Sequence, residues 1–246
     1  MQANKILMAG HSKFKNIMHR KGAQDLKKAK AFSRASKEII VAVKAAGSDE
    51  NFNPKLRSAL ANAKKVNLPK DRIDYAIKKA NNQTDKDSYE EIRYEGYGPE
   101  GIGIIVETLT DNKNRTASEV RSCFNKFNSV LAAQGGVSYL FVKVSEIIYH
   151  IPPDQYDDFY NKVLELDIID CEQTDSECIV ICDFEKFSEI TEFIKRHFGD
   201  FTSFNVKWRS QSELELDNLQ KEKVLKLVDA LDNLEDTQYV CHNLKL

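Results

Sequence analysis

Glycine, proline and cysteine are all scarce in this 246-residue chain, and each scarcity excludes a class of protein. Ten glycines and five prolines are too few for large disordered tracts, while an apolar fraction of 41% suffices for ordinary hydrophobic cores. Five cysteines are an odd number and are scattered along the chain, which is not the pattern of a disulfide framework. We therefore expect the protein to work in a reducing cytoplasm.

Long apolar runs and catalytic motifs are also missing. The longest purely apolar run in the first 84 residues, at positions 39–43, is far too short to cross a bilayer, and residues 1–7 lack the apolar stretch of a signal peptide. The chain has no H-E-x-x-H, G-x-S-x-G or P-loop motif, and no histidine or cysteine cluster at metal-ligand spacing. We predict that the protein is not an enzyme and holds neither a cofactor nor a metal.

Charge is distributed very unevenly. The first 84 residues contain 19 of the 36 Lys and Arg residues but only six Asp or Glu, whereas the other 162 contain 17 basic and 32 acidic residues. A compact basic region attracts polyanions through its field and through counterion release. This imbalance predicts that nucleic acid contacts the N-terminal region and not the acidic remainder.

The apolar periodicity predicts an α+β fold. Residues 25–46, 54–66 and 69–80 show helical spacing, and the polar stretch 81–87 has no period and is typical of a linker. Beyond it, residues 144–209 predict the order β-α-β-β-α-β of a ferredoxin-like unit. The flanking segments predict strands at 102–108, 137–142, 212–216 and 238–242 and helices at 116–127 and 219–234. We therefore expect an N-terminal three-helix domain (8–84) followed by two ferredoxin-like α/β domains, one (144–209) inserted into the other (85–143 and 210–246).

One side of the first predicted helix carries a row of cations. Its members are separated by three, four, three and seven residues, and they are Lys27, Lys30, Arg34, Lys37 and Lys44. Such a row is often only a solvated face, but a solvated face normally mixes both signs, and Glu38 is the only acid in this helix after Asp25. We interpret the row as a phosphate-binding ridge, which Lys64, Lys65, Lys70 and Arg72 extend onto the next two helices.

A basic segment at residues 10–21 precedes this helix and has no clear period. Cations and hydrogen-bonding groups in such an arm can follow a phosphate backbone. Phe14 can stack on an exposed base, or it can pack against the helices. The predicted contact residues of the arm are Lys13, Phe14, Lys15, His19, Arg20 and Lys21.

A polar loop between a predicted strand and a helix is a candidate site for an anion or a partner. It contains Asp111, Asn112, Asn114 and Arg115, and a loop at a helix N-terminus can hold an anion with free amides. Helix capping alone explains the same residues equally well. Because ferredoxin-like units host many activities, an enzymatic cleft around Arg115 is a remote third alternative.

Several long strings in the chain closely resemble the YebC family. They include residues 8–14, 67–71, 94–99, 109–116 and 238–243, so the resemblance covers nearly the whole chain. Phe14 stands where many members have Trp, which preserves an aromatic side chain. Residues 125–134 lack the glycine pair that the family has before Gly135 and Gly136, and residues 166–170 replace a smaller Ala/Gly-rich turn.

The resemblance implies a fold and a function. It implies three domains, one helical and two α/β, in a protein that regulates gene expression without catalysis. Some members are described as DNA-binding transcriptional regulators, and others act in translation at the ribosome. We expect a DNA-binding transcriptional regulator first and a ribosome-associated translation factor that contacts ribosomal RNA second, because both phosphate chains attract the same cations.

Overall fold

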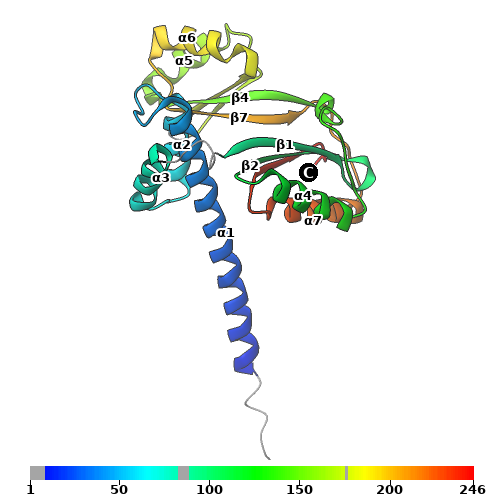
Figure 1. Ribbon diagram of the computed structural model, residues 1–246. Helices are drawn as coiled ribbons and strands as arrows, with labels where there is room; N and C mark the ends of the chain where they lie inside the picture. The colour runs from blue at the N-terminus through cyan, green and yellow to red at the C-terminus, as the bar shows by residue number, and fades with distance from the viewer. Residues whose placement is uncertain (1–8, 83–88, 175–176) are drawn as a thin grey trace, which may run out of the picture.

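Three helices form the N-terminal part of the protein. The computed structural model describes residues 9–82, 89–174 and 177–246, and within the first helix it describes the side chains of Asp25 and of residues from Lys27 onward. Helix α1 spans Ala9–Ala46, α2 spans Pro54–Lys65 and α3 spans Lys70–Asn82. Figure 1 shows that α2 and α3 lie against the C-terminal half of α1, while its N-terminal half extends away from the rest of the molecule.

The apolar stripes predicted from the sequence form the core of this helical region. Ile39 and Leu56 are fully buried, and Ala76 of α3 packs into the same cluster. Asn53 joins two helices, because its side chain accepts a hydrogen bond from the Leu56 amide (3.0 Å) and donates to the carbonyl of Ala42 (2.7 Å). This one side chain satisfies a free amide of α2 and a carbonyl near the end of α1.

Helix α1 is longer than predicted. Residues 10–21 were expected to form an arm without regular structure, but they belong to α1, which begins at Ala9 and not near Asp25. The prediction was wrong because it relied on an apolar period. Five of these twelve residues are Lys, Arg or Met, which have high helix propensity, so the segment can be helical without an apolar period in its sequence.

The first sheet has the strand order β3-β1-β2-β8, with every pair antiparallel. Its strands are β1 (Glu90–Tyr97), β2 (Gly103–Thr110), β3 (Val130–Leu131) and β8 (Thr237–His242). Helices α4 (Lys113–Lys126) and α7 (Asn218–Asp232) cover one face, and Ile104, Phe124 and Leu227 fill the core between them. The other face lies toward the second sheet (Figure 1).

The second sheet has the order β5-β6-β4-β7, which is the ferredoxin-like order predicted for residues 144–209. Its strands are β4 (Phe141–Tyr149), β5 (Asp170–Gln173), β6 (Cys178–Asp183) and β7 (Ser203–Ser210), and its helices are α5 (Tyr156–Val163) and α6 (Phe187–Phe198). The α+β fold with two such units is therefore confirmed, and the second sheet is inserted in sequence between β3 and α7. Four short 3₁₀ segments complete the described elements: η2 (Pro99–Gly101), η3 (Ser138–Leu140), η4 (Pro153–Gln155) and η5 (Phe184–Lys186).

Three predicted strands differ from the structure. The strands predicted at 137–142 and, as the first strand of the inserted unit, at 147–151 overlap the two ends of one strand, β4, because polar Ser145 and Glu146 interrupt the apolar pattern while the backbone pairs on both sides. The segment 212–216 is not a strand of the first sheet and makes only an isolated bridge from Leu214 to Leu244. Strand β1 takes its place beside β2, so the first sheet has the spatial order of a ferredoxin-like unit with its strands in a permuted sequence order.

Candidate nucleic-acid interface

Exposed cations gather where α2 ends and α3 begins. Lys64 and Lys65 are the last residues of α2, and Lys70 and Arg72 lie in the first turn of α3; all four are exposed. The turn between them is tight. The amide of Leu68 donates to the carbonyl of Ala63, and Asn67 has a left-handed φ of 56°, which asparagine tolerates better than most residues. The turn thus holds four positive charges at one corner of the helical region.

Aromatic side chains join this corner to α1. The Arg72 guanidinium lies 5.8 Å from the centre of the Phe32 ring, and the Lys28 ammonium lies 5.5 Å from the same ring. Tyr75 on α3 is 68% exposed, although an apolar ring usually costs free energy in water. We name Lys28, Lys64, Lys65, Lys70, Arg72 and Tyr75 the corner surface.

Sequence reasoning missed Tyr75. Its signal was present, because Arg72 precedes it by three residues and Lys78 and Lys79 follow it by three and four, which places cations on its side of the helix. An exposed ring among cations is the usual composition of a surface on which nucleic-acid bases stack.

The predicted ridge on α1 is present only in part. Lys27 is exposed and Lys44 is half-buried. For Lys30, Arg34 and Lys37 the prediction of a ridge facing solvent is wrong, because these side chains lie between α1 and the C-terminal part of the first sheet.

Lys37 is the most enclosed of the three. It is 6% exposed, and its ammonium lies 2.7 Å from Oδ1 of Asp236 and 3.4 Å from the carbonyl oxygens of Leu109 and Glu235. A buried ammonium is tolerated only when it is paired and hydrogen-bonded, and Lys37 meets both conditions. It is therefore not available to a phosphate.

Arg34 lies one helical turn away and binds residues on either side of the segment that Lys37 contacts. Its Nε donates to the carbonyl of Thr237 (2.7 Å), and its Nη2 donates to both the carbonyl and the carboxylate of Asp232 (2.8 Å each). The planar guanidinium spans the end of α7 and the start of β8, which is a geometry that lysine cannot reproduce.

Lys30 is at the edge of this contact. Its ammonium nitrogen is buried and has no hydrogen-bond partner among the described residues. Burial, together with repulsion from Arg34 and Lys37, lowers the pKa of Lys30 from 10.5 to about 8, against the opposing attraction of Asp232. Lys30 is thus the one cation of this group whose position costs free energy.

Asp236 is the centre of the contact between α1 and the first sheet. It is fully buried, and beside Lys37 it accepts hydrogen bonds from Arg115 (2.6 Å), Thr116 (2.7 Å) and Thr110 (2.9 Å). Burial by itself would raise the pKa of the Asp236 carboxyl, but the hydrogen bonds from Arg115, Lys37 and Thr116 hold that pKa well below its ordinary range. Two cations and two hydroxyls satisfy one carboxylate.

The Asp236 carboxylate also binds Arg115 of the loop that was predicted to hold an anion or a partner. The Arg115 guanidinium binds Asp236 and Asp111 (3.0 Å), and Asn112 accepts from the Arg115 amide (3.1 Å) as the N-cap of α4. Asn114 is exposed. The capping alternative describes these residues, whereas the alternative of a free anion site conflicts with the pairing of Arg115. The helix predicted to begin at residue 116 begins three residues earlier, at Lys113, with Asn112 as its N-cap.

The predicted arm residues lie outside the described side chains. These are Lys13, Phe14, Lys15, His19, Arg20 and Lys21, and their backbone belongs to α1. Among the described residues, no three His, Cys, Asp or Glu side chains lie together as metal ligands would. In the same part of the chain, every helix is too short or too polar to span a membrane.

Comparison with known proteins places the chain in a family. Residues 12–83 match the family described as "TACO1/YebC protein N-terminal domain", and residues 89–244 match "TACO1/YebC second and third domain". A "Probable transcriptional regulatory protein" of Rickettsia bellii is 45% identical over 97% of this chain and 95% of its own length. Its counterpart in Rickettsia canadensis is 46% identical over 97% and 96%.

A solved structure shares the fold. The crystal structure of a conserved hypothetical protein from Aquifex aeolicus is 34% identical, covers 89% of this chain and 90% of its own, and superposes with a TM-score of 0.72. Together with the matches to residues 12–83 and 89–244, it shows that this chain belongs to the TACO1/YebC family, whose two Rickettsia members above are named probable transcriptional regulatory proteins.

Proposed function

We propose that this protein is a non-enzymatic regulator of gene expression that binds nucleic acid, most directly DNA, through the corner surface and the exposed side of α1. The observation that carries the proposal is the corner of α2 and α3, where four cations face solvent without a carboxylate partner among the described residues. The names of the relatives support a role in transcription.

The proposed contact is made mainly to phosphates. Lysine ammonium groups and Arg72 neutralise backbone charges, and Tyr75 offers a ring on which a base can stack. No Asn, Gln or Arg row is positioned on one helix for reading base edges among the described residues, so we expect weak sequence specificity. We also propose that three of the hydrophobic clusters mark three domains with the boundaries expected from the sequence, while a fourth cluster, which includes Ile105 and Phe141, joins residues of the two sheets.

The test is a charge reversal at the corner. A variant with Lys64→Glu, Lys65→Glu, Lys70→Glu and Arg72→Glu is expected to bind labelled duplex DNA at least ~100-fold more weakly at 0.1 M salt, because each lost phosphate contact removes about one released counterion. Fluorescence anisotropy measures the affinity, and thermal unfolding confirms that the variant is folded.

A matched control keeps the net charge equal. Lys126, Lys195, Lys223 and Lys226 are exposed on α4, α6 and α7, so the same reversal at these positions changes the total charge by the same amount elsewhere. We expect this control to lose less than ~10-fold, since only the general field changes. Equal losses in the two variants would contradict a localised interface.

Ribosomal RNA offers the same phosphates as DNA. Co-sedimentation with ribosomes at moderate salt, compared with duplex affinity at the same salt, therefore separates a transcriptional from a translational regulator. If the protein binds ribosomes but not duplex DNA, and the corner variant does not bind ribosomes, the protein is a translational regulator that uses the same interface.

A further inference from the structure

An open cleft lies between α2 and one end of the second sheet. Its volume is about 470 Å³. The α2 side contributes Arg57, Leu60, Ala61, Lys64 and Lys65, and the loop before α2 contributes Glu50 and Asn51. The opposite side consists of His150, Glu177 and Thr202 from three connections of the second sheet and of Ser203, the first residue of β7.

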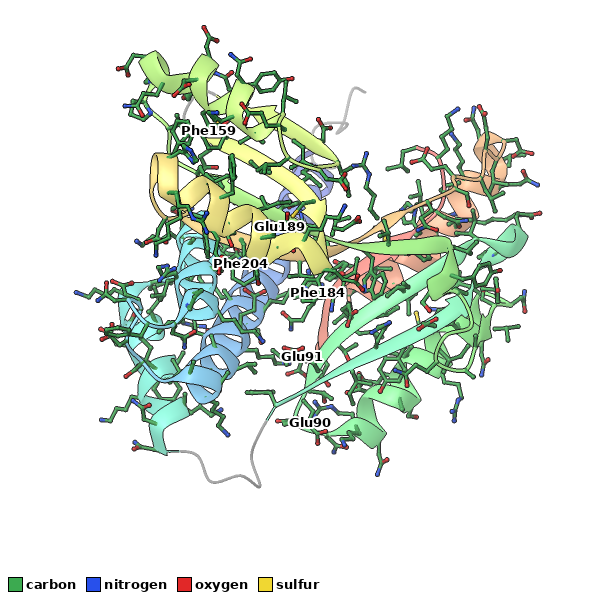
Figure 2. All side chains as sticks on the ribbon, turned by 90° about the horizontal axis from the view of Figure 1, so that it is seen from above. Glu90, Glu91, Phe159, Phe184, Glu189 and Phe204 are labelled. Atoms are coloured by element: carbon green, nitrogen blue, oxygen red, sulfur yellow. The ribbon has the colours of Figure 1, made fainter. Side chains whose placement is uncertain are left out.

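The two sides of the cleft are held together by direct contacts. The amide of Phe204 donates to the hydroxyl of Ser58 (2.9 Å), and the side chain of Asn62 donates to that of Asn205 (3.2 Å). Figure 2 shows the strand that carries Phe204 beside the N-terminal helices. Because these bonds join α2 directly to β7, the cleft exists before any ligand binds, which lowers the entropy cost of binding.

Arg57 supports the floor of the cleft. Its guanidinium donates to the carbonyls of Glu50 (3.0 Å) and Asn51 (3.2 Å) and lies 5.5 Å from the centre of the Phe201 ring. The loop before α2 is thereby fixed to the edge of the second sheet. The positive charge of Arg57 remains beside the cleft, although its donors are partly used.

The charge of the cleft differs from that of the second sheet as a whole. Residues 144–209 contain 15 acidic and six basic side chains. At the cleft this region presents the exposed imidazole of His150 and the exposed Thr202, with the buried Ser203 beside it, and one carboxylate, Glu177, which lies 3.9 Å from Nε2 of His150. Lys64 and Lys65 face them from α2. With Arg57, three cations line the cleft against two carboxylates, Glu50 and Glu177, so the lining is positive although the second sheet as a whole is acidic, as a site for an anion requires.

We propose that this cleft binds one phosphodiester segment of a nucleic-acid strand, so that the backbone continues from the corner of α2 and α3 onto the second sheet. This inference rests on the proposed function and extends it, because it assigns one wall of the interface to the acidic region. The cleft volume lies in the range of natural ligand sites, and it suits a single nucleotide. Lys64 and Lys65 neutralise the phosphate, and the hydroxyl of Thr202 donates to its oxygen.

The decisive variant is Thr202→Glu. Thr202 is exposed, so the substitution leaves the core intact and places a carboxylate where the phosphate is proposed to lie. We expect the affinity for labelled DNA or RNA to fall about tenfold, since two like charges a few ångströms apart repel each other. Asn161→Glu is the matched control, because it adds the same charge to exposed α5 of the same region.

A second variant tests the cleft without adding a charge. Replacing Lys64 and Lys65 together by Gln is expected to reduce the slope of log affinity against log salt by about 1 to 2. Adding Thr202→Glu to this variant is expected to cost less than it does in the wild type, because the phosphate is then no longer held in the cleft.

The outcomes separate the two proposals. Wild-type protein that binds nucleic acid, with Thr202→Glu and Asn161→Glu both unchanged, would overturn the cleft and leave the corner surface in place. Wild-type protein that binds neither DNA, RNA nor ribosomes would overturn the proposed function and the cleft with it. A selective loss in Thr202→Glu at unchanged melting temperature supports the cleft.

Discussion

Helix α1 carries two sets of cations that the sequence presents as one. Lys27 and Lys28 face solvent, whereas Arg34 and Lys37, only two or three turns later, bind Asp232 and Asp236. The first set remains available to a polyanion outside the protein, and the second set is neutralised inside it. The spacing of cations along a helix predicts only that they lie on one side of it. Whether each cation binds an outside ligand or an internal carboxylate depends on the element that packs against that side.

The largest expected loss of stability comes from the second set, Arg34 and Lys37, and from the carboxylate that binds Lys37. Asp236→Ala leaves Lys37 and Arg115 without their shared carboxylate, and removing one partner of a buried ion pair typically costs about 3 to 5 kcal/mol of unfolding free energy. Thermal and urea unfolding measure this loss. Asp229→Ala, at an exposed position of α7, is the control and should stay within ~0.5 kcal/mol.

The pH dependence of this loss has a definite sign. The folded pKa of Asp236 lies far below its value in the unfolded chain, about 3.9. The carboxylate therefore stabilises the fold fully above pH ~4 and progressively less as pH falls toward the folded pKa. The difference between wild type and Asp236→Ala should be constant near pH 7 and shrink below pH ~4; a difference that grows in acid would contradict the ion pair.

Except for the start of α1, the sequence predicted the three helices of the N-terminal region because their signals are local. The apolar stripes lie within the helices that they predict, and in the structure Asn53 directly precedes α2 and Gly47 directly follows α1. The partner of Lys37 is not local. Asp236 lies 199 residues away, and no spacing within α1 distinguishes a lysine that faces solvent from one that faces β8.

The prediction of the strand order in the first sheet was wrong for a related reason. Sequence order suggested that residues 212–216 complete the first sheet, but β1 already occupies that position beside β2. Strand pairing depends on which edges remain open after the earlier strands have paired, and one-dimensional patterns do not record this. The corner surface was partly predictable, since Lys64, Lys65, Lys70 and Arg72 were recognised, while the exposure of Tyr75 required the packing of α3.

Removing the charge of Lys30 is expected to change stability less than Asp236→Ala does, and in the opposite direction. Its folded pKa of about 8 lies below the unfolded value of 10.5, so below pH 8 the folded state carries the full cost of a poorly solvated ammonium. Lys30→Met should therefore raise the melting temperature at pH 7. The advantage over wild type should shrink as pH rises from 8 to 10.5, where wild-type Lys30 loses its proton in the folded state.

A lower melting temperature for Lys30→Met at pH 7, or an advantage independent of pH, would show that Lys30 is paired in solution. Lys30→Arg serves as the control, because a guanidinium keeps its charge throughout this pH range and should show no such convergence with Lys30→Met.

The smallest change in stability is expected from the first set, the solvent-facing Lys27 and Lys28 of α1. Lys27→Ala should change the unfolding free energy by less than ~0.5 kcal/mol, because Lys27 is exposed and makes no ion pair among the described residues. The affinity of the Lys27→Ala variant for DNA should fall only a few-fold, and equally for all DNA sequences, as expected for the loss of one phosphate contact. A loss of stability comparable with that of Asp236→Ala would erase the distinction between the two sets.

The most direct test measures both properties in the same two variants. Fluorescence anisotropy with labelled DNA and thermal unfolding are recorded for the four-residue corner reversal and for Asp236→Ala, at a temperature where both are folded. The corner reversal should lose binding and keep its melting temperature, while Asp236→Ala should lose melting temperature and keep binding within a few-fold. Corner-reversed protein that still binds with wild-type affinity would contradict the claim that the solvent-facing cations form the nucleic-acid interface.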